Sequence, residues 1–311
     1  MQILTAARQT ESKPDSLPVF LWRLARQSRK ANTLHDLGRN LEYVGRLLPY
    51  WHWLSGLRAR FADARLQPLL QAQPTLLDRV RRPYQDRRWG VRQRYEALIS
   101  HYDWLLARFD TDALARIYQP QGSLLAELHG AACCWQLRLL LDRKFDREGE
   151  LVLALFAAEG QRLATLAFTV TGAAAARSLR IGGLQGDKAA GQEAFRQFTK
   201  DCHGLRPLAF LLAAAQDLAA AWGCAGVLAI SHDQHVYQHW RYRLGTHRVT
   251  RVYDALWEES GGLPEQGWYR LPAPAPETDP AAAPSNKRAM YRRRQTMLAR
   301  LRVDLASARV V

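Results

Sequence analysis

The pattern of apolar and polar residues changes its period near residue 133 of this 311-residue chain. From residue 17 to about residue 118, leucines, tryptophans and arginines recur at helical spacing, and prolines divide the region into short segments. Beyond residue 133, apolar runs of strand length are separated by turn residues, and longer segments return to helical spacing. The pattern predicts an α+β protein, with a helical N-terminal half followed by a mixed α/β half.

The second half contains six predicted strands and three predicted helices. The strands are residues 134–145, 150–160, 161–170, 178–186, 226–233 and 267–272, with a hairpin turn at Glu159-Gly160. The helices are residues 191–204, 206–223 and 235–245. We expect a further strand within residues 247–259.

Composition divides the chain into four parts. Residues 1–130 form a mainly helical region, and residues 131–270 form an α/β domain. Residues 271–286 are rich in proline and alanine, which predicts an extended and mobile linker. Residues 287–311 are basic and amphipathic, which predicts a C-terminal helix that packs onto the body or onto an acidic surface.

The net charge of +15 and the pI of about 10.1 have two interpretations. A basic protein attracts acidic partners: anionic lipid, a phosphate-bearing acyl donor or, as a weaker option, nucleic acid. Of the 44 basic residues, six are lysines, at positions 13, 30, 144, 188, 200 and 287, and the rest are arginines. A GC-rich genome also produces such an arginine bias, so charge alone does not select a function.

The cysteines and the apolar stretches indicate the cellular location of the protein. Cys133 and Cys134 are adjacent, and Cys202 and Cys224 stand alone, so there is no disulfide framework. The N-terminal residues lack the apolar core of a signal peptide, and polar residues interrupt the longest apolar stretch, residues 205–230. We therefore expect a cytoplasmic protein with no transmembrane segment, peripheral to the inner membrane if it meets a membrane at all.

The glycine-rich end of the fourth predicted strand, Ile181–Gly186, is the first candidate binding element. Here Gly183, Gln185 and Gly186 would let backbone N–H groups approach a phosphate or a carbonyl group. The segment matches neither a dinucleotide-binding fingerprint nor a phosphate-binding Walker loop. A bulged turn that only glycine fits is the alternative interpretation.

The start of the long alanine-rich helix is the second candidate binding element. Pro207 suits the first helical turn, which places Arg206 beside free N–H groups at the positive end of the helix dipole. With His203, this arrangement would bind an anion. Alternatively, His203 and Arg206 only fix the loop in place.

The histidine-rich segment from Ser231 to Arg243 contains the candidate catalytic residues. If the segment is helical, His232, His235 and His239 share one face, and Asp233 could orient a histidine that acts as a general base. The zinc-protease pattern of two histidines around a glutamate is missing, so we expect no metal site. A histidine that caps a strand or bonds within the core is the alternative.

Several of these motifs together resemble a known family. The segments IGGLQG, HGLRP, HVYQHWRYR, YDALWEESGG and YRLP followed by KRAMYRRR resemble, in order and wording, the VirK/YbjX family of bacterial proteins. The resemblance covers roughly residues 35 to 302 and departs from the family in the proline-rich stretch 271–286. It implies links to virulence, envelope stress, antimicrobial-peptide resistance and a DNA-damage response. It implies no catalytic residues, because the family has no established reaction.

The order of the predicted elements is similar to the GCN5-related acyltransferase fold. That similarity implies acyl-CoA or an acyl carrier as cofactor, with its phosphates at the start of the helix that follows the glycine-rich strand. Here residues 186–205 replace the short glycine-rich loop of that fold. Two hypotheses follow: an N-acyltransferase with His232 or Asp233 as base, or a non-enzymatic factor that binds an anionic membrane surface or nucleic acid.

Overall fold

The computed structural model describes residues 19, 20, 22, 25, 34–130, 133–243, 253–277 and 279–307. The chain forms two compact units, Met1–Arg81 and Arg82–Val311. This division lies well before the expected boundary at residue 130, because helix α5 (Val91–Arg108) packs on a strand of the α/β unit. Strand β1 (Ser123–His129), which the sequence pattern did not predict, also precedes residue 131.

The N-terminal unit is helical, as expected. Its α-helices are α2 (Leu34–Leu47), α3 (Trp51–Arg60) and α4 (Gln67–Ala72), followed by a 3₁₀ turn at Pro74–Val80. Leucines form its core, and the hydroxyl of Tyr43 donates a 2.7 Å hydrogen bond to the buried carboxylate of Asp78. The leucine periodicity thus produces short helices that bury one face each.

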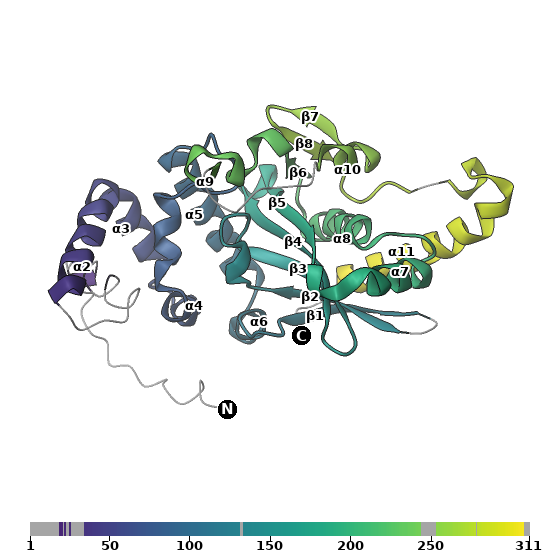
Figure 1. Ribbon diagram of the computed structural model, residues 1–311, viewed down its shortest axis with the longest axis horizontal. Coiled ribbons are helices and arrows are strands. Elements are labelled where there is room, and N and C mark those ends of the chain that lie inside the picture. Colours follow the sequence, from purple (N-terminus) through teal and green to yellow (C-terminus); the bar gives the residue numbers. More distant parts are fainter. Residues whose placement is uncertain are drawn as a thin grey trace. The chain divides into compact units, whose positions relative to one another are not determined.

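The second unit contains one mixed sheet of eight strands, in the order β1-β2-β3-β4-β5-β6-β8-β7 (Figure 1). The remaining strands are β2 (Cys134–Leu140), β3 (Leu151–Ala157), β4 (Arg162–Thr171), β5 (Ser178–Gly186), β6 (Gly226–Ile230), β7 (Leu263–Glu265) and β8 (Trp268–Leu271). Neighbouring strands are antiparallel except β5 and β6, which are parallel. The expected fold class, a helical part followed by a mixed α/β part, is confirmed.

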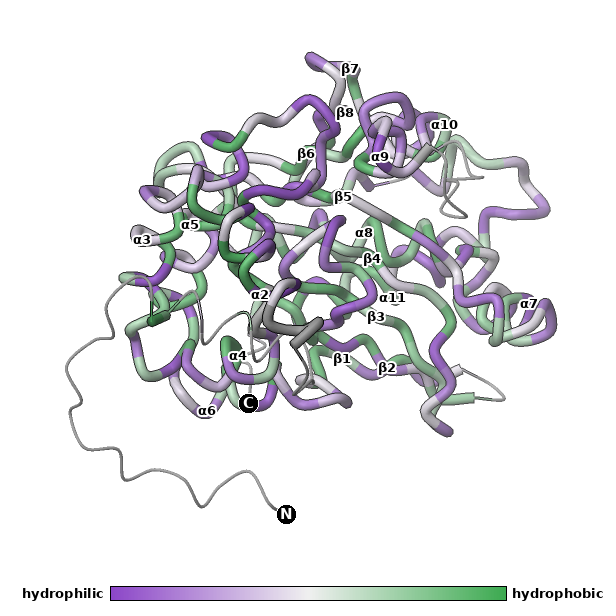
Figure 2. The backbone as a smooth tube through the Cα atoms, turned by 60° about the vertical axis from the view of Figure 1, so that its left-hand side comes forward, coloured by the Kyte–Doolittle hydropathy of each residue, from purple (hydrophilic) through white to green (hydrophobic). Residues whose placement is uncertain are grey.

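Helices cover the sheet and close its core. After α5 come α6 (Thr111–Ile117), α7 (Gly191–Asp201), α8 (Pro207–Ala221), α9 (Trp240–Arg243), α10 (Asp254–Glu259) and α11 (Arg288–Ser307). Both α5 and α8 contact β4, which is buried at every position after Arg162. Strands β3 and β4 and helix α8 are accordingly apolar along most of their length (Figure 2).

All six predicted strands are present, but two other predictions are wrong. Residues 235–245 were expected to form one helix, yet two 3₁₀ turns (His232–Gln234 and Val236–Gln238) precede the single turn of α9. The expected strand within residues 247–259 is wrong in its described part, where α10 is helical; its first six residues lie outside the described residues. A short apolar run is compatible with a helical turn and with a strand, so the sequence pattern alone does not distinguish the two.

The C-terminal helix α11 is clamped onto α8 by a buried ion pair. Nε of Arg302 lies 3.1 Å from the carboxylate of Asp217, which is 2% exposed. Asp217 also accepts a 3.0 Å hydrogen bond from the backbone N–H of Ala275, so the proline-rich segment begins anchored to α8. Burial raises the pKa of Asp217, while Arg302 opposes that effect. The basic tail is therefore part of the folded body.

We predict that Arg302→Ala lowers the free energy of unfolding by roughly 3 kcal/mol, because it leaves a buried carboxylate without its cation. Arg300→Ala, at an exposed position of the same helix, should change it by less than about 0.5 kcal/mol. Urea unfolding measures both variants. Equal effects of the two substitutions would contradict the clamp.

The four cysteines should differ sharply in reactivity. Burial raises the pKa of Cys202 to about 12 and that of Cys224 to about 11, whereas Cys133 and Cys134 are half-buried. Iodoacetamide should label Cys133 and Cys134 in the native protein, and all four thiols only after unfolding, as mass spectrometry can show.

The raised pKa values of Cys202 and Cys224 also predict that the protein becomes less stable at alkaline pH. Since the folded-state pKa values of Cys202 and Cys224 lie above the ordinary 9.0, the unfolded chain loses these protons first as pH rises. The free energy of unfolding should therefore fall from about pH 9 upward, and less steeply in the Cys202→Ala variant. If the free energy of unfolding falls with pH equally steeply in Cys202→Ala and in the wild-type protein, Cys202 is not a cause of the alkaline loss of stability.

Candidate functional site

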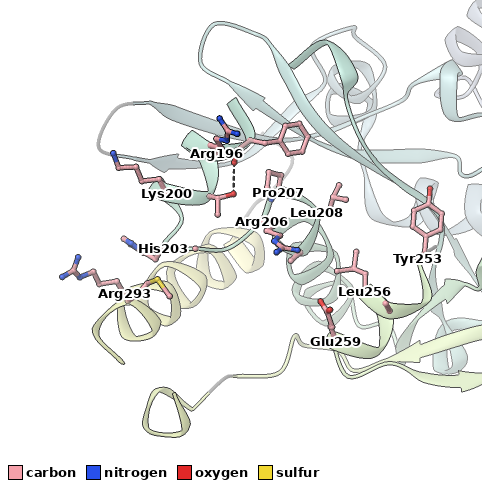
Figure 3. Close-up of a pocket in the computed structure, with 16 residues that line it drawn as sticks. Arg196, Lys200, His203, Arg206, Pro207, Leu208, Tyr253, Leu256, Glu259 and Arg293 are labelled. Atoms are coloured by element: carbon pink, nitrogen blue, oxygen red, sulfur yellow. Dashed lines mark hydrogen bonds between the residues drawn. The ribbon is translucent and has the colours of Figure 1, made fainter. Parts of the chain in front are cut away.

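A cavity of about 1070 Å³ opens at the N-terminus of α8 (Figure 3). Helices α7, α8, α10 and α11 each contribute to its wall, as does the loop between α7 and α8. Four exposed cationic side chains line it: Arg196, Lys200, Arg206 and Arg293. Glu259 is the acidic residue of the lining. This excess of positive charge suits an anionic ligand.

The first turn of α8 adds backbone donors to this charge. Arg206 is the residue before the helix, in an extended conformation, and Pro207 is the first helical residue. The N–H groups of Leu208 and Ala209, which also line the cavity, have no acceptor within a helix at these positions. The side chain of Arg206 lies at the start of α8, as Figure 3 shows. The predicted anion site at Arg206 thus coincides with a cavity.

The loop that carries His203 and Arg206 is held by α11. His203 has a positive φ of 52°, and Gly204 follows with a φ of 81°. The guanidinium group of Arg294 donates two hydrogen bonds, of 3.1 and 2.8 Å, to the carbonyl oxygen of His203. His203 lines the cavity as well. The loop is therefore fixed by Arg294 of α11 through its backbone, and His203 and Arg206 line the cavity.

An apolar portion of the wall accompanies the cations. Phe195, Pro207, Leu208, Leu256 and Met290 contribute it. A ligand that fills this cavity would therefore combine negative charge with an apolar part.

The glycine-rich strand β5 contains a β-bulge. Ala167 and Phe168 of β4 face Gly183 and Ile181, which leaves Gly182 as the extra residue. A Cβ on Gly182 would lie 1.9 Å from the carbonyl oxygen of Glu148, and one on Gly183 would lie 2.3 Å from its carboxylate. These glycines are thus required by the packing of Glu148, which supports the bulge interpretation for Gly183.

The last residues of β5 lie near a second cavity. Gly186 lines a cavity of about 450 Å³, together with Lys188 and Arg196. Arg196 of α7 lines the larger cavity as well. Gln185 is half-buried and pairs with Thr165 of β4. Gly186 therefore lines a different cavity from Arg206, whereas Gly183 is buried in the sheet.

The candidate base His232 lies next to the wall of the larger cavity. Its backbone N–H donates a 2.8 Å hydrogen bond to Asp254, the first residue of α10, and α10 contributes Leu256 to the cavity. The Nε2 atom of His232 lies 3.2 Å from the amide nitrogen of Gln238. Asp233 is exposed. Because the segment is not helical, the expected common face of His232, His235 and His239 does not form.

His235 is fully buried. Its Nε2 atom lies 3.2 Å from a carboxylate oxygen of Glu148, and its Nδ1 atom accepts a hydrogen bond from the backbone N–H of Tyr237. The acidic residue that faces a histidine ring is therefore Glu148 and not Asp233. With both ring nitrogens occupied, His235 positions the loop beside His232.

A second set of buried polar side chains lies in Tyr84–Trp89. The sequence analysis proposed no site residue in this segment. The side-chain amide nitrogen of Gln85 lies 3.0 to 3.2 Å from three acceptors, on Glu148, Thr169 and Arg180. The carboxylate of Asp86 accepts hydrogen bonds from Trp268 and Arg88. Every partner except Arg88 is more than sixty residues away along the chain, so no local motif could have revealed them.

Comparison with known proteins places these features in a family. A family model described as "Protein of unknown function (DUF535)" matches residues 32–307. The chain is 33% identical over 245 residues to the uncharacterized protein YbjX of Escherichia coli strain K12, covering 78% of this chain and 74% of that protein. An uncharacterized protein of Haemophilus influenzae is 27% identical over 261 residues, covering 79% and 85%.

Among solved structures, a mutant cAMP-binding acyltransferase from Mycobacterium smegmatis aligns with 68% of this chain at a TM-score of 0.29 and 13% identity. The alignment spans 61% of that enzyme. A likeness at this level carries no inference about activity. In the part of the chain that the structure describes, no helix has the length and apolar character needed to cross a membrane.

We predict that Gly182→Ala destabilises the fold by about 1–3 kcal/mol, since the new methyl group would collide with the backbone of Glu148. Gly45→Ala is the matched control. It lies in α2 with open space around it and should be neutral or stabilising by up to about 1 kcal/mol. Thermal and urea unfolding of both variants measure the difference, and a tolerated Gly182→Ala would refute the bulge.

Proposed function

The chain belongs to the DUF535 family of YbjX-like proteins of unknown function, and we propose that it binds a phosphate-bearing acyl donor and transfers the acyl group to an amine. The observation that carries this proposal is the 1070 Å³ cavity, in which four cations surround the N-terminus of α8 beside an apolar wall. Acyl-CoA and acyl carriers combine those two properties: phosphates and an apolar acyl chain.

The sheet supports the same assignment. Strands β5 and β6 pair only from Ser178–Gly226 to Ile181–Ala229, and β5 then continues to Gly186 paired with β4 but not with β6. In the GCN5-related fold, which this sheet resembles, the donor's phosphates bind at the helix that follows the diverging strand. Here the corresponding helix is α8, and Arg206 precedes its first turn. The inserted α7 supplies Arg196 and Lys200 in place of a glycine-rich loop.

In the proposed reaction, the acceptor amine attacks the carbonyl carbon of the donor's thioester. A C–N bond forms as the C–S bond breaks, and the proton lost by the amine reaches the departing thiolate. His232 would carry this proton, because its loop is bonded to α10, whose residues line the cavity. Asp233 would stay exposed to solvent, and His235 with Glu148 would hold the loop.

Helix α11 favours one alternative function, a factor that binds an anionic membrane surface without catalysis. Its exposed arginines include Arg288, Arg292, Arg293 and Arg300, while Leu301 and Leu305 are buried. Binding of this kind weakens steeply with salt. The envelope-stress, virulence and peptide-resistance roles implied by the family resemblance are compatible with either function and stay predictions, as does the cytoplasmic location.

We predict that CoA and acyl-CoA raise the melting temperature of the wild-type protein. A ligand at 100 times its Kd adds about 2.7 kcal/mol to the free energy of unfolding. Arg206→Glu should weaken the binding at least about tenfold, because it replaces a cation at the anion site. A glutamate before a helix suits the helix dipole, so the variant should remain folded.

Arg143→Glu makes the same charge change at an exposed position that does not line the cavity, and it should bind donors normally. Donor binding that survives Arg206→Glu, or that both variants lose equally, would overturn the assignment. No donor binding together with salt-sensitive adsorption to anionic vesicles would favour the alternative function.

A further inference from the structure

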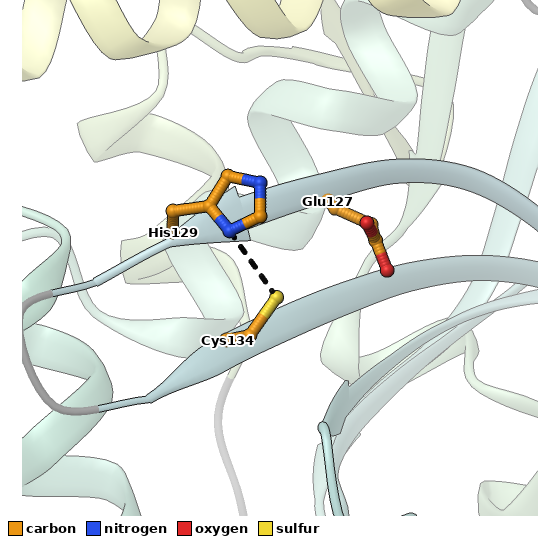
Figure 4. Close-up of side chains that lie close together, drawn as sticks. All are labelled: Glu127, His129 and Cys134. Atoms are coloured by element: carbon orange, nitrogen blue, oxygen red, sulfur yellow. Dashed lines mark hydrogen bonds between the residues drawn. The ribbon is translucent and has the colours of Figure 1, made fainter.

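The hairpin of β1 and β2 places three metal-ligating side chains together on an exposed face of the sheet. His129 and Cys134 are directly opposite each other in the ladder, and Glu127 lies two residues before His129 on the same face (Figure 4). Their ligand atoms all lie within 4.8 Å of one another. In the part of the chain that the structure describes, no second group of three such residues meets this criterion.

The spacing of two of these atoms matches a metal site. Nδ1 of His129 lies 3.6 Å from Sγ of Cys134. In a tetrahedral zinc site, with Zn–S of about 2.3 Å and Zn–N of about 2.0–2.1 Å, the sulfur and nitrogen ligands are about 3.5 Å apart. A cation can therefore bind between this thiolate and imidazole without movement of the backbone.

The third side chain, Glu127, is oriented by a chain of hydrogen bonds. The amide nitrogen of Gln136 donates a 2.9 Å hydrogen bond to one carboxylate oxygen of Glu127. The amide oxygen of Gln136 in turn accepts hydrogen bonds of 3.0 and 2.8 Å from Arg138. Metal ligands usually have outer partners of this kind, which fix their direction. Because Glu127 is exposed, a change of rotamer can bring its second oxygen within reach of the cation.

The donor set selects the kind of cation. Thiolate and imidazole ligands suit zinc and related transition metals, whereas magnesium and calcium prefer oxygen ligands. Three protein ligands leave a fourth position open, as in catalytic rather than structural zinc sites. Glu127 and His129 also line a cavity of about 440 Å³, to which Arg292 and Arg300 of α11 contribute. An anionic ligand could therefore approach the open position.

We propose that Glu127, His129 and Cys134 form a zinc-binding site with one open coordination position. This departs from our expectation that the chain has no metal site. It rests on side chains outside the 1070 Å³ cavity and is independent of the acyl-transfer proposal.

The test is titration of the reduced, full-length protein with Co²⁺, which gives a thiolate-to-cobalt charge-transfer band in a site of this kind. One equivalent of Co²⁺ should produce the band, and Zn²⁺ should abolish it by displacement. Cys134→Ser should lose the band, and His129→Gln should weaken Zn²⁺ binding at least about tenfold. Gln136→Leu, which removes the outer partner, should weaken it by about 10- to 100-fold.

Cys133→Ser is the matched control, because Cys133 is the neighbouring half-buried thiol and is not one of the three clustered ligands. It should keep the band. Absence of the band in the wild-type protein would overturn the proposal, as would its persistence in Cys134→Ser or its loss in Cys133→Ser. Circular dichroism of each variant, together with the graded effect of His129→Gln, separates loss of a ligand from loss of the fold.

Discussion

The short parallel pairing of β5 and β6 is the constraint on which the rest of the α/β unit depends. Four residue pairs join the two strands, and beyond Ile181 the backbone of β5 has no strand beside it on that side. Buried backbone groups must find other partners. The side chain of Gln85 bonds the carbonyl oxygen of Arg180, and a bulge at Gly182 brings the strand against Glu148. The two irregularities of β5 thus lie on opposite sides of the strand, since the bulge faces β4 and the divergence faces β6.

The same divergence makes the chain leave the sheet through α7 and return through α8, and the main cavity lies where these helices meet α10 and α11. Helix α11 contacts both α8 and the loop that precedes it. Arg302 bonds Asp217 inside α8, and Arg294 bonds the loop before α8 at His203. The basic C-terminal segment therefore contributes to the cavity wall, and its Arg294 and Arg302 make contacts within the folded body.

The proposed zinc site lies in a different physical setting. Strand β1 is at one edge of the sheet, and His129 and Glu127 are exposed. Side chains at such positions are not needed to fill the core, so their chemistry is free to vary. A metal bound across the last pair of the hairpin would join an edge strand to its neighbour.

The sequence by itself determined most of the elements and the family. Alternating apolar runs gave all six strands that it predicted, Pro207 marked the start of α8, and the recurring motifs indicated the VirK/YbjX family. It also located Arg206, because the start of a helix is a local feature. Only the tertiary structure decided that His235 faces Glu148 instead of Asp233, that Arg293 reaches the cavity, and that His129 and Cys134 meet across a ladder. These contacts join residues through strand register and helix packing, and such distances are not encoded by any local pattern of side chains.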